Sequence, residues 1–144
     1  MVSATLDVNV LVSAAISPRG VPYQLIDAWQ AQRFALITSQ HIIDQLMLKL
    51  RSDRIGRRYG LTTAAIRDFT APLRRDARRI VLPPSEILSI TGDPEDDAVL
   101  ATARLGQAAY LVTGDGGLLA RSPYDGIPII TPRAFLELLD AEDR

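Results

Sequence analysis

The sequence predicts a three-layer α/β/α fold in which helices cover both faces of a central, mainly parallel sheet. Short runs rich in Val, Ile and Leu alternate with longer segments whose apolar residues recur at helical spacing. The predicted order is β-α-β-α-α-β-α-β-α-β-α, and strands that alternate with helices form parallel sheets. The chain has 144 residues, 47% of them hydrophobic, with no internal repeat and no linker-like stretch. We therefore expect residues 1–144 to form a single domain.

The opening run, residues 4–13, is apolar and β-branched, which is typical of a central strand covered on both faces. It contains one carboxylate, Asp7, and one amide, Asn9. A carboxylate in such a strand is costly unless it is hydrogen-bonded, paired or bound to a metal. Two interpretations remain open. Either the whole run is a strand, or the strand ends near Asp7 and Asn9 caps a short helix through residue 15.

The next three elements are a helix, a strand and a second helix. Pro22 suits the first turn of a helix that runs to about residue 31, because its fixed φ matches helical backbone. The apolar run at residues 34–38 is the second strand. Ser39 is the expected N-cap of the following helix, whose apolar stripe reaches Leu50.

The basic middle of the chain contains a further helix and strand. Thr62 is placed to cap the helix. Pro72 should end it near residue 71, because proline lacks the backbone donor that a helix interior needs. Residues 79–82 form a short third strand that two prolines close.

The last third of the chain continues the alternation. Asp93 can cap a helix that opens with a proline and carries acids in its first turn, where the helix dipole favours them. Residues 109–113 form a buried strand, and a short helix follows. Residues 127–130 form the last strand, at an edge of the sheet because Pro128 cannot donate to a neighbour. Thr131 caps the final helix.

The composition excludes several kinds of chemistry. The absence of Cys excludes a disulfide framework, a thiol nucleophile and a cysteine zinc site. The single histidine, His41, excludes a multi-histidine metal site and disfavours a Ser-His-Asp triad. No apolar run reaches the roughly 18 residues of a membrane helix and no signal-peptide pattern is visible, so we expect a soluble, cytoplasmic protein that does not contact a membrane. Any chemistry must rest mainly on carboxylates.

The charges are unevenly distributed. Residues 49–79 carry ten Arg or Lys and three acids, whereas residues 80–144 carry four Arg and eleven acids. This pattern suits a protein that holds a polyanion near a carboxylate cluster, although two solvated basic helices would also produce it. The candidate contacts to a nucleic-acid backbone are Lys49, Arg51, Arg54, Arg57 and Arg58, with the basic residues of 74–79 as further candidates.

The acids near the strand ends should meet at one edge of the sheet, because ligand sites in parallel sheets lie beyond the carboxyl ends of the strands. Asp7 lies there if its strand ends early, Asp115 follows the strand at 109–113, and Asp96 opens the helix that leads into that strand. Close carboxylates repel one another unless a cation offsets their charge. Oxygen ligands favour Mg²⁺ or Mn²⁺, and such a metal suits phosphodiester hydrolysis. The sequence therefore predicts a divalent-metal site.

Each candidate also has a purely structural interpretation. Asp93 is better explained as a helix cap than as a ligand. Asp96 shares the buried face of its helix and should point toward the sheet, whereas Asp97 lies one position round and should border the solvent. Thr113 and the acid after it could be turn formers, and Asn9 could simply be a cap.

Four stretches of the sequence resemble the PIN domain. They are LDVNVLVS at residues 6–13, DPEDDAVL at 93–100, LVTGD at 111–115 and IITPRAFL at 129–136. The likeness runs nearly end to end, and it is closest to the VapC-like toxins of bacterial toxin–antitoxin pairs.

The resemblance implies a PIN-like fold and a Mg²⁺- or Mn²⁺-dependent ribonuclease, commonly dimeric and held inactive by an antitoxin. The residues that match the family's site are the metal-site and catalytic acids Asp7, Asp96 and Asp115, the supporting groups Asn9 and Thr113, and Asp97 beside them. The expected partners are therefore an RNA substrate, an antitoxin and a second copy of the chain.

Two positions depart from the family pattern. The family usually has a Glu six residues past the capping Ser, and here that supporting position is Gln45, which offers an amide oxygen without charge. The adjacent Asp44 lies on the other side of the apolar stripe, because successive helical residues differ by about 100°. The family also often has a fourth acid two residues after the one that matches Asp115, and here that position is Gly117.

These departures support an alternative function, a PIN-like module that binds RNA or a partner protein without cutting. A third hypothesis is a phosphatase with Asp7 as nucleophile. Asn9 counts against it, because such enzymes usually have a second Asp two residues after the first.

Overall fold

The computed structural model describes residues 1–142, which contain one five-stranded sheet whose strands all run parallel. The strands are β1 (Ser3–Leu6), β2 (Ala35–Ser39), β3 (Arg78–Ile80), β4 (Tyr110–Val112) and β5 (Ile129–Ile130). They lie in the order β3-β2-β1-β4-β5, so β1 is central and β3 and β5 form the edges. The predicted parallel sheet, with the opening strand in its middle and the last strand at an edge, is confirmed.

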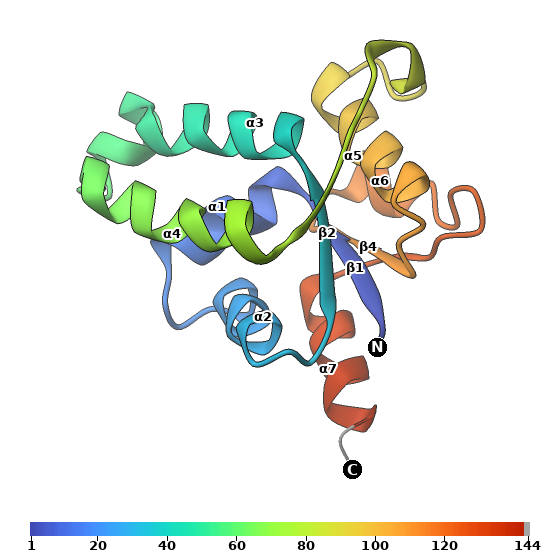
Figure 1. Cartoon of the computed structure of the whole chain (residues 1–144), viewed down its shortest axis with the longest axis horizontal. Helices are drawn as coiled ribbons and strands as arrows, with labels where there is room; N and C mark the ends of the chain where they lie inside the picture. Colours follow the sequence, from blue (N-terminus) through green and yellow to red (C-terminus); the bar gives the residue numbers. More distant parts are fainter. Residues whose placement is uncertain (143–144) are drawn as a thin grey trace.

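Helices cover the sheet on both sides. They are α1 (Val8–Ile16), α2 (Val21–Gln30), α3 (Gln40–Arg51), α4 (Thr63–Asp76), α5 (Pro94–Leu105), α6 (Gly116–Leu119) and α7 (Pro132–Glu142), with a π-helical turn η1 (Asp53–Arg57) and a 3-10 turn η2 (Pro84–Glu86). In Figure 1 the strands run through the middle of the molecule, with α1 to α4 on one side and α5 and α6 on the other. Helix α5 packs on β1, β2 and β4, and α7 packs against α2. The fold is the predicted three-layer α/β/α arrangement.

The core between the sheet and the helices is aliphatic, with an aromatic pair that fixes the last helix. Phe34, just before β2, and Phe135 in α7 are both fully buried. Their rings meet edge to face with centroids 5.0 Å apart, and Tyr110 of β4 lies 5.8 Å from Phe135. Such pairs add roughly 0.5–1.5 kcal/mol beyond the area that they bury. The end of the described chain is thereby tied to the start of two strands.

The opening run divides into a strand and a helix at Asp7. Strand β1 ends at Leu6 and α1 begins at Val8, so the interpretation of the whole run as a strand is wrong. The cap of the helix is Asp7, whose carboxylate accepts a hydrogen bond from the backbone N–H of Val10, and not Asn9 as expected. The carboxylate satisfies an N–H that the first turn of the helix leaves free, and it does so at the end of a strand.

Helix α4 does not end before Pro72, as its sequence predicted, but continues to Asp76. Ile66 and Leu73 lie seven residues apart on the same face, and both are buried. Proline removes the hydrogen bond to the carbonyl four residues earlier. That carbonyl belongs to the exposed Asp68, where water can satisfy it, while the burial of Leu73 holds the second half of the helix in place.

The remaining boundaries differ from the predictions by a few residues. The third strand covers Arg78–Ile80 and not 79–82, and the last covers only Ile129–Ile130. Edge strands have a neighbour on one side only, and both of these are edges, so their ends depend on that neighbour more than on their own sequence. No helix within residues 1–142 is both long and apolar enough to cross a membrane.

Gly106, which follows α5, provides a test of how closely that helix packs on the sheet. A Cβ at this position would lie 2.4 Å from Cγ2 of Ile37 and 3.0 Å from the carbonyl oxygen of Thr102. We predict that Gly106→Ala lowers the free energy of unfolding by about 1–3 kcal/mol, because overpacking forces neighbours to move. Urea denaturation measures this change. Gly116→Ala is the control, since nothing lies within 4 Å of its Cβ, and equal stability of the two variants would contradict the packing.

Candidate active site

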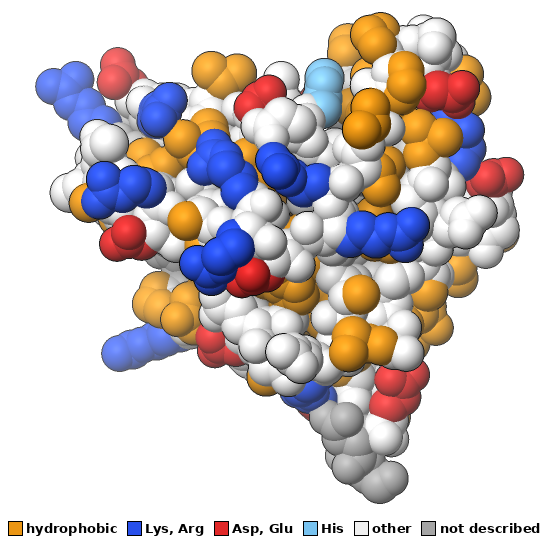
Figure 2. Space-filling model, in the orientation of Figure 1, with side chains coloured by type: hydrophobic (Ala, Val, Ile, Leu, Met, Phe, Trp, Pro, Cys, Tyr) orange, Lys and Arg blue, Asp and Glu red, His pale blue; other side chains and the backbone are white. Residues whose placement is uncertain are grey.

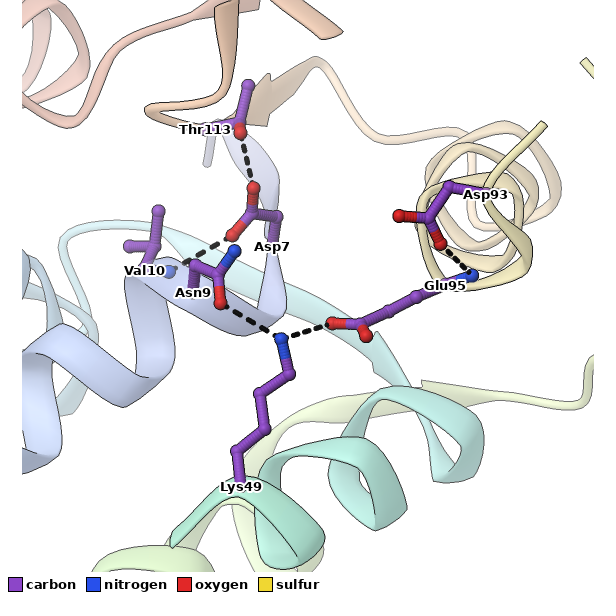
Figure 3. A network of polar contacts seen from close by, with 7 residues as sticks. All are labelled: Asp7, Asn9, Val10, Lys49, Asp93, Glu95 and Thr113. Atoms are coloured by element: carbon purple, nitrogen blue, oxygen red, sulfur yellow. Dashed lines mark hydrogen bonds and ion pairs between the residues drawn. The ribbon is translucent and has the colours of Figure 1, made fainter. Parts of the chain in front are cut away.

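Three segments of the chain meet at the carboxyl edge of the sheet. Leu6 pairs with Val112 at the ends of β1 and β4, so the residues that follow them, Asp7 and Thr113, are neighbours. Helix α5 leads into β4, and its first turn therefore lies at the same edge as the end of that strand. Figure 3 shows side chains from α1, α3, the end of β4 and the start of α5 at this edge.

Asp7 is the most buried acid of this edge, with only 4% of its surface exposed. One carboxylate oxygen accepts the hydrogen bond from Val10 N at 3.0 Å, and the other accepts one from the hydroxyl of Thr113. Burial raises the pKa of Asp7 above its ordinary value, although the hydrogen bonds from Thr113 and from the start of α1 act in the opposite direction. The carboxylate is thus held in one orientation at the end of the central strand.

Thr113 connects Asp7 with Asp115. Its buried hydroxyl donates to Asp7 and accepts the backbone N–H of Asp115 at 3.0 Å. Asp115 caps α6, because its Oδ2 accepts the N–H of Leu118 at 2.8 Å. Within residues 1–142 its other carboxylate oxygen has no hydrogen-bond partner, and the residue is exposed. Thr113 therefore holds both acids in fixed positions and leaves one of them open to a ligand.

The pKa of Asp96, in the first turn of α5, is affected by its burial and by the neighbouring acids. Burial, the largest cause, and the negative charges of Asp93, Asp115, Asp7 and Glu95 together raise this pKa to about 6. Because like charges disfavour ionisation, the charge contributions to this shift indicate that Asp96 lies near enough to these four acids to be affected by them. The acids of the three segments thus lie at the same edge of the sheet.

Asp97 does not border the solvent as predicted, since only 6% of its surface is exposed. Its Oδ1 accepts hydrogen bonds from the backbone N–H of Ile90 at 3.2 Å and from the N–H and hydroxyl of Thr91 at 2.8 and 2.9 Å. Burial alone would raise its pKa, but these bonds outweigh it and hold the pKa below the ordinary value. The segment before α5 folds over the helix's first turn, which helical periodicity does not reveal. Asp97 anchors that segment.

Lys49 reaches from α3 to the acids. Its Nζ donates to Oδ1 of Asn9 at 3.1 Å and forms an ion pair with Oε1 of Glu95 at 2.9 Å (Figure 3). The Asn9 side chain therefore faces a lysine and does not cap a helix. The contact with Glu95 was not predicted. The sequence indicates only that Lys49 lies four residues after Gln45, so both side chains are on the same side of α3.

The two departures from the family pattern are visible at this edge. Gln45 is half-buried one turn before Lys49, and its side chain makes no hydrogen bond within residues 1–142. Asp44 is exposed and accepts a hydrogen bond from Nε2 of Gln40 at 2.8 Å. A Cβ at Gly117 would lie 3.1 Å from Oδ2 of Asp115, so a larger residue there would crowd that acid. Neither position adds a negative charge to the edge.

The residues of this edge fit a hard divalent cation in their chemistry and charge. Asp7, Asp96 and Asp115 offer only oxygen donors, the kind that Mg²⁺ and Mn²⁺ prefer. A cation would offset both the burial and the like charges that together raise the pKa of Asp96 to about 6. Within residues 1–142 no three acidic, histidine or cysteine side chains are gathered closely enough to form a ready-made metal site. The carboxylates would therefore have to draw together around the ion.

A groove of about 460 Å³ opens beside Asp115. Its lining residues are Asn9, Val10, Ser13, Pro22, Gly114, Asp115 and Pro132. A larger cavity, of about 690 Å³, lies among residues that begin the strands, such as Met1 and Ala35, and so opens at the opposite edge of the sheet from the acids. We place the candidate site at the smaller groove, because Asp115 and Asn9 line it and it opens at the edge where the acids lie.

In a parallel α/β sheet, ligand sites lie beyond the carboxyl ends of the strands, which is the edge at which these acids lie. The chain matches the PIN domain family over residues 3–116, and it belongs to this family, whose members are typically nucleases. It is 22% identical to the uncharacterized protein MJ1680 of Methanocaldococcus jannaschii, over 94% of this chain and 90% of that protein.

Two solved structures share the fold. PAE2754 from Pyrobaculum aerophilum superposes with a TM-score of 0.65 at 22% identity, covering 97% of this chain and 90% of that one. FitAcB from Neisseria gonorrhoeae superposes with a TM-score of 0.53 at 16% identity, covering 90% of this chain and 98% of the other. At these identities the likeness establishes the fold alone.

The hydrogen bonds of Asp97 predict a stability effect. Asp97→Ala leaves the donors of Ile90 and Thr91 without their acceptor in a partly buried place, which should cost roughly 1–3 kcal/mol of folding free energy. Chemical denaturation measures the loss. Asp68→Ala, an exposed acid on α4, should change stability by less than about 0.5 kcal/mol. If both variants are equally stable, Asp97 does not anchor the segment before α5.

The raised pKa of Asp96 predicts that the stability of the metal-free protein depends on pH. Its pKa in the folded chain is about 6, above the ordinary 3.8, so the folded state holds the proton more tightly. Stability should therefore fall as pH rises from about 4 to about 6. Asp96→Asn should melt at a higher temperature than the parent at pH 7.5 in EDTA, and this advantage should shrink toward pH 4.5. A difference in melting temperature between Asp96→Asn and the parent that does not depend on pH would contradict the raised pKa of Asp96.

Proposed function

We propose that this PIN-domain protein is a Mg²⁺- or Mn²⁺-dependent endoribonuclease. The observation that carries the proposal is that carboxylates from three segments lie at one edge of the sheet, where burial and, after it, their mutual charges raise the pKa of Asp96 to about 6. Acids that repel one another at the edge of a parallel sheet form an arrangement that a bound divalent cation would stabilise. Membership of the PIN family, whose members are typically nucleases, supports this class of reaction.

In this proposal Asp7, Asp96 and Asp115 hold the metal and are the catalytic acids. When bound, the ion supplies Lewis-acid activation of the RNA phosphodiester and of the attacking water. Thr113 keeps Asp7 in one orientation and fixes the backbone of Asp115. Asp115 lines the groove of about 460 Å³, where a strand of RNA would approach. Gln45 contributes at most a neutral amide oxygen.

The basic surface is proposed to hold the RNA backbone. Figure 2 shows several Lys and Arg side chains over the region that α3 and α4 occupy in Figure 1. The exposed arginines of α3, η1, α4 and β3 are Arg51, Arg54, Arg57, Arg67, Arg74, Arg75, Arg78 and Arg79, with Arg58 after η1. Contacts of this kind to phosphate release counterions, so RNA affinity should fall steeply with salt.

The partners follow from the resemblance to VapC-like toxins. We propose that the protein is the toxin of a toxin–antitoxin pair, that it acts on RNA in the cytoplasm, that it forms a homodimer and that an antitoxin protein holds it inactive. The support is the sequence likeness at residues 6–13, 93–100 and 111–115 together with membership of the PIN family. Purification of the chain with the product of a neighbouring gene would test the pairing.

A second candidate function is a module that binds RNA or a partner protein without cutting. Gln45 and Gly117 favour it, because each replaces an acid that the family usually has. If the missing helix carboxylate is what limits catalysis, Gln45→Glu should confer or increase metal-dependent cleavage. If Gln45→Glu and the parent are both inactive while RNA still binds, the non-catalytic function is the better account.

The nuclease proposal predicts metal-dependent cleavage of a mixed RNA pool by the purified protein. Cleavage should occur with Mn²⁺ or Mg²⁺ and stop in EDTA. Asp96→Asn and Asp115→Asn should each lower the rate by about 100-fold or more, since each removes a charge that holds the metal. Asp68→Asn, with the same chemical change on α4, should cut like the parent. Cleavage that survives both site substitutions, or persists in EDTA, would overturn the assignment.

A further inference from the structure

We propose that Lys49 binds the RNA phosphate next to the acidic edge, and that Glu95 occupies Lys49 until the phosphate displaces it. The inference rests on the proposed nuclease function in assuming an RNA ligand, and it adds a specific phosphate-binding residue and an internal competitor. It differs from a general backbone contact, because Lys49 is half-buried and contacts Glu95 and Asn9 (Figure 3), whereas the arginines after it are exposed.

The position of the ammonium group carries the inference. Nζ of Lys49 lies where α3, α1 and α5 meet, 3.1 Å from Oδ1 of Asn9 and 2.9 Å from Oε1 of Glu95. An ammonium has three N–H donors, and these two partners use two of them. Within residues 1–142 the third donor has no partner. A cation with an open donor, bound to the residue that precedes Asp96 in the chain and to the side chain two residues after Asp7, is suitably located to bind a substrate phosphate.

The type of residue fits this role. Lys49 is the only lysine in the sequence, and the other fifteen basic residues are arginines. Arginine presents a planar fork that matches one carboxylate or phosphate, whereas lysine is a point charge on a flexible stem that can contact groups in several directions. An ammonium bound to Asn9 can therefore exchange its second partner without a change of geometry.

Replacement of Glu95 by an RNA phosphate at Lys49 should cost little free energy. The side chains of Lys49 and Glu95 are 29% and 27% exposed, so solvent screens their ion pair. A phosphodiester carries the same single charge as the carboxylate that it replaces. Released Glu95 can turn toward solvent, away from Asp96, which feels its negative charge. RNA thereby replaces a protein carboxylate at Lys49, so that Lys49 stays paired while solvent hydrates the released Glu95.

A purely structural ion pair between α3 and α5 makes a different prediction. If the pair only holds the two helices together, Lys49→Gln and Glu95→Gln break the same contact and should affect RNA binding in the same direction. If Glu95 competes with phosphate, the two substitutions should act in opposite directions. The sign of the two effects separates the alternatives.

The experiment measures the affinity of a fluorescently labelled single-stranded RNA by anisotropy, in EDTA so that cleavage cannot interfere. Lys49→Gln should weaken binding by about 5–10-fold and reduce the slope of log affinity against log salt by about 0.7, the value for one phosphate contact on a single strand. Glu95→Gln should tighten binding by about 3-fold. Asp140→Asn, which breaks the equally close ion pair with Arg33 in another part of the fold, should have little effect.

A second measurement uses the wild-type chain and does not depend on variants that fold. Selective labelling with ¹³Cε,¹⁵Nζ-lysine places the side-chain label on Lys49 only, because there is no other lysine, and it leaves the three N–H donors unchanged. Addition of the same RNA should shift the Lys49 resonance.

Three results would overturn the inference: shifts of Kd in the same direction for Lys49→Gln and Glu95→Gln, equal tightening by Asp140→Asn, or RNA binding that is undetectable or leaves the Lys49 resonance unmoved. Opposite shifts in a protein that cuts no RNA would retain Lys49 as a phosphate-binding residue and reject only the nuclease.

Discussion

The hydrogen bond from Thr113 to Asp7 is the interaction on which the candidate site depends. It joins the ends of β1 and β4, and it holds a carboxylate that is 4% exposed. The same carboxylate starts α1, and the same threonine fixes the backbone of Asp115. A structural cap and a candidate ligand are therefore one residue. The cost of burying this charge, visible in its raised pKa, is what a bound cation would offset.

The charged residues near the hydrogen bond from Thr113 to Asp7 form two groups. Asp7, Asp96 and Asp115 lie at the carboxyl edge of the sheet, where a divalent ion would offset the burial and the like charges that raise the pKa of Asp96. Lys49 belongs to the second group and contacts Glu95 and Asn9. Metal and RNA phosphate would thus have separate positions, the metal among the acids of the first group and the phosphate at Lys49. The arginines of α3, α4 and β3 extend the positive surface beyond them.

The sequence predicted the parallel sheet, its central strand and the edge at which the acids gather, because these follow from hydrophobic runs and from topology. It did not predict features that depend on contacts between distant segments. Asp97 is buried by the segment that precedes its own helix, and α4 continues past Pro72 because Leu73 packs into the core. The contact of Lys49 with Glu95 joins two helices whose distance no periodicity gives. Asp7 was expected near the end of its strand, but its role as the cap depends on backbone angles that composition does not fix.

The central claim is that the acids at this edge form a site for a divalent metal. Calorimetric titration of the purified protein with Mn²⁺, beside Asp96→Asn and Asp68→Asn, tests it most directly because it requires neither substrate nor turnover. The account predicts binding by the parent and by Asp68→Asn, and at least about 10-fold weaker binding by Asp96→Asn. No binding by the parent, or equal binding by all three proteins, would contradict it.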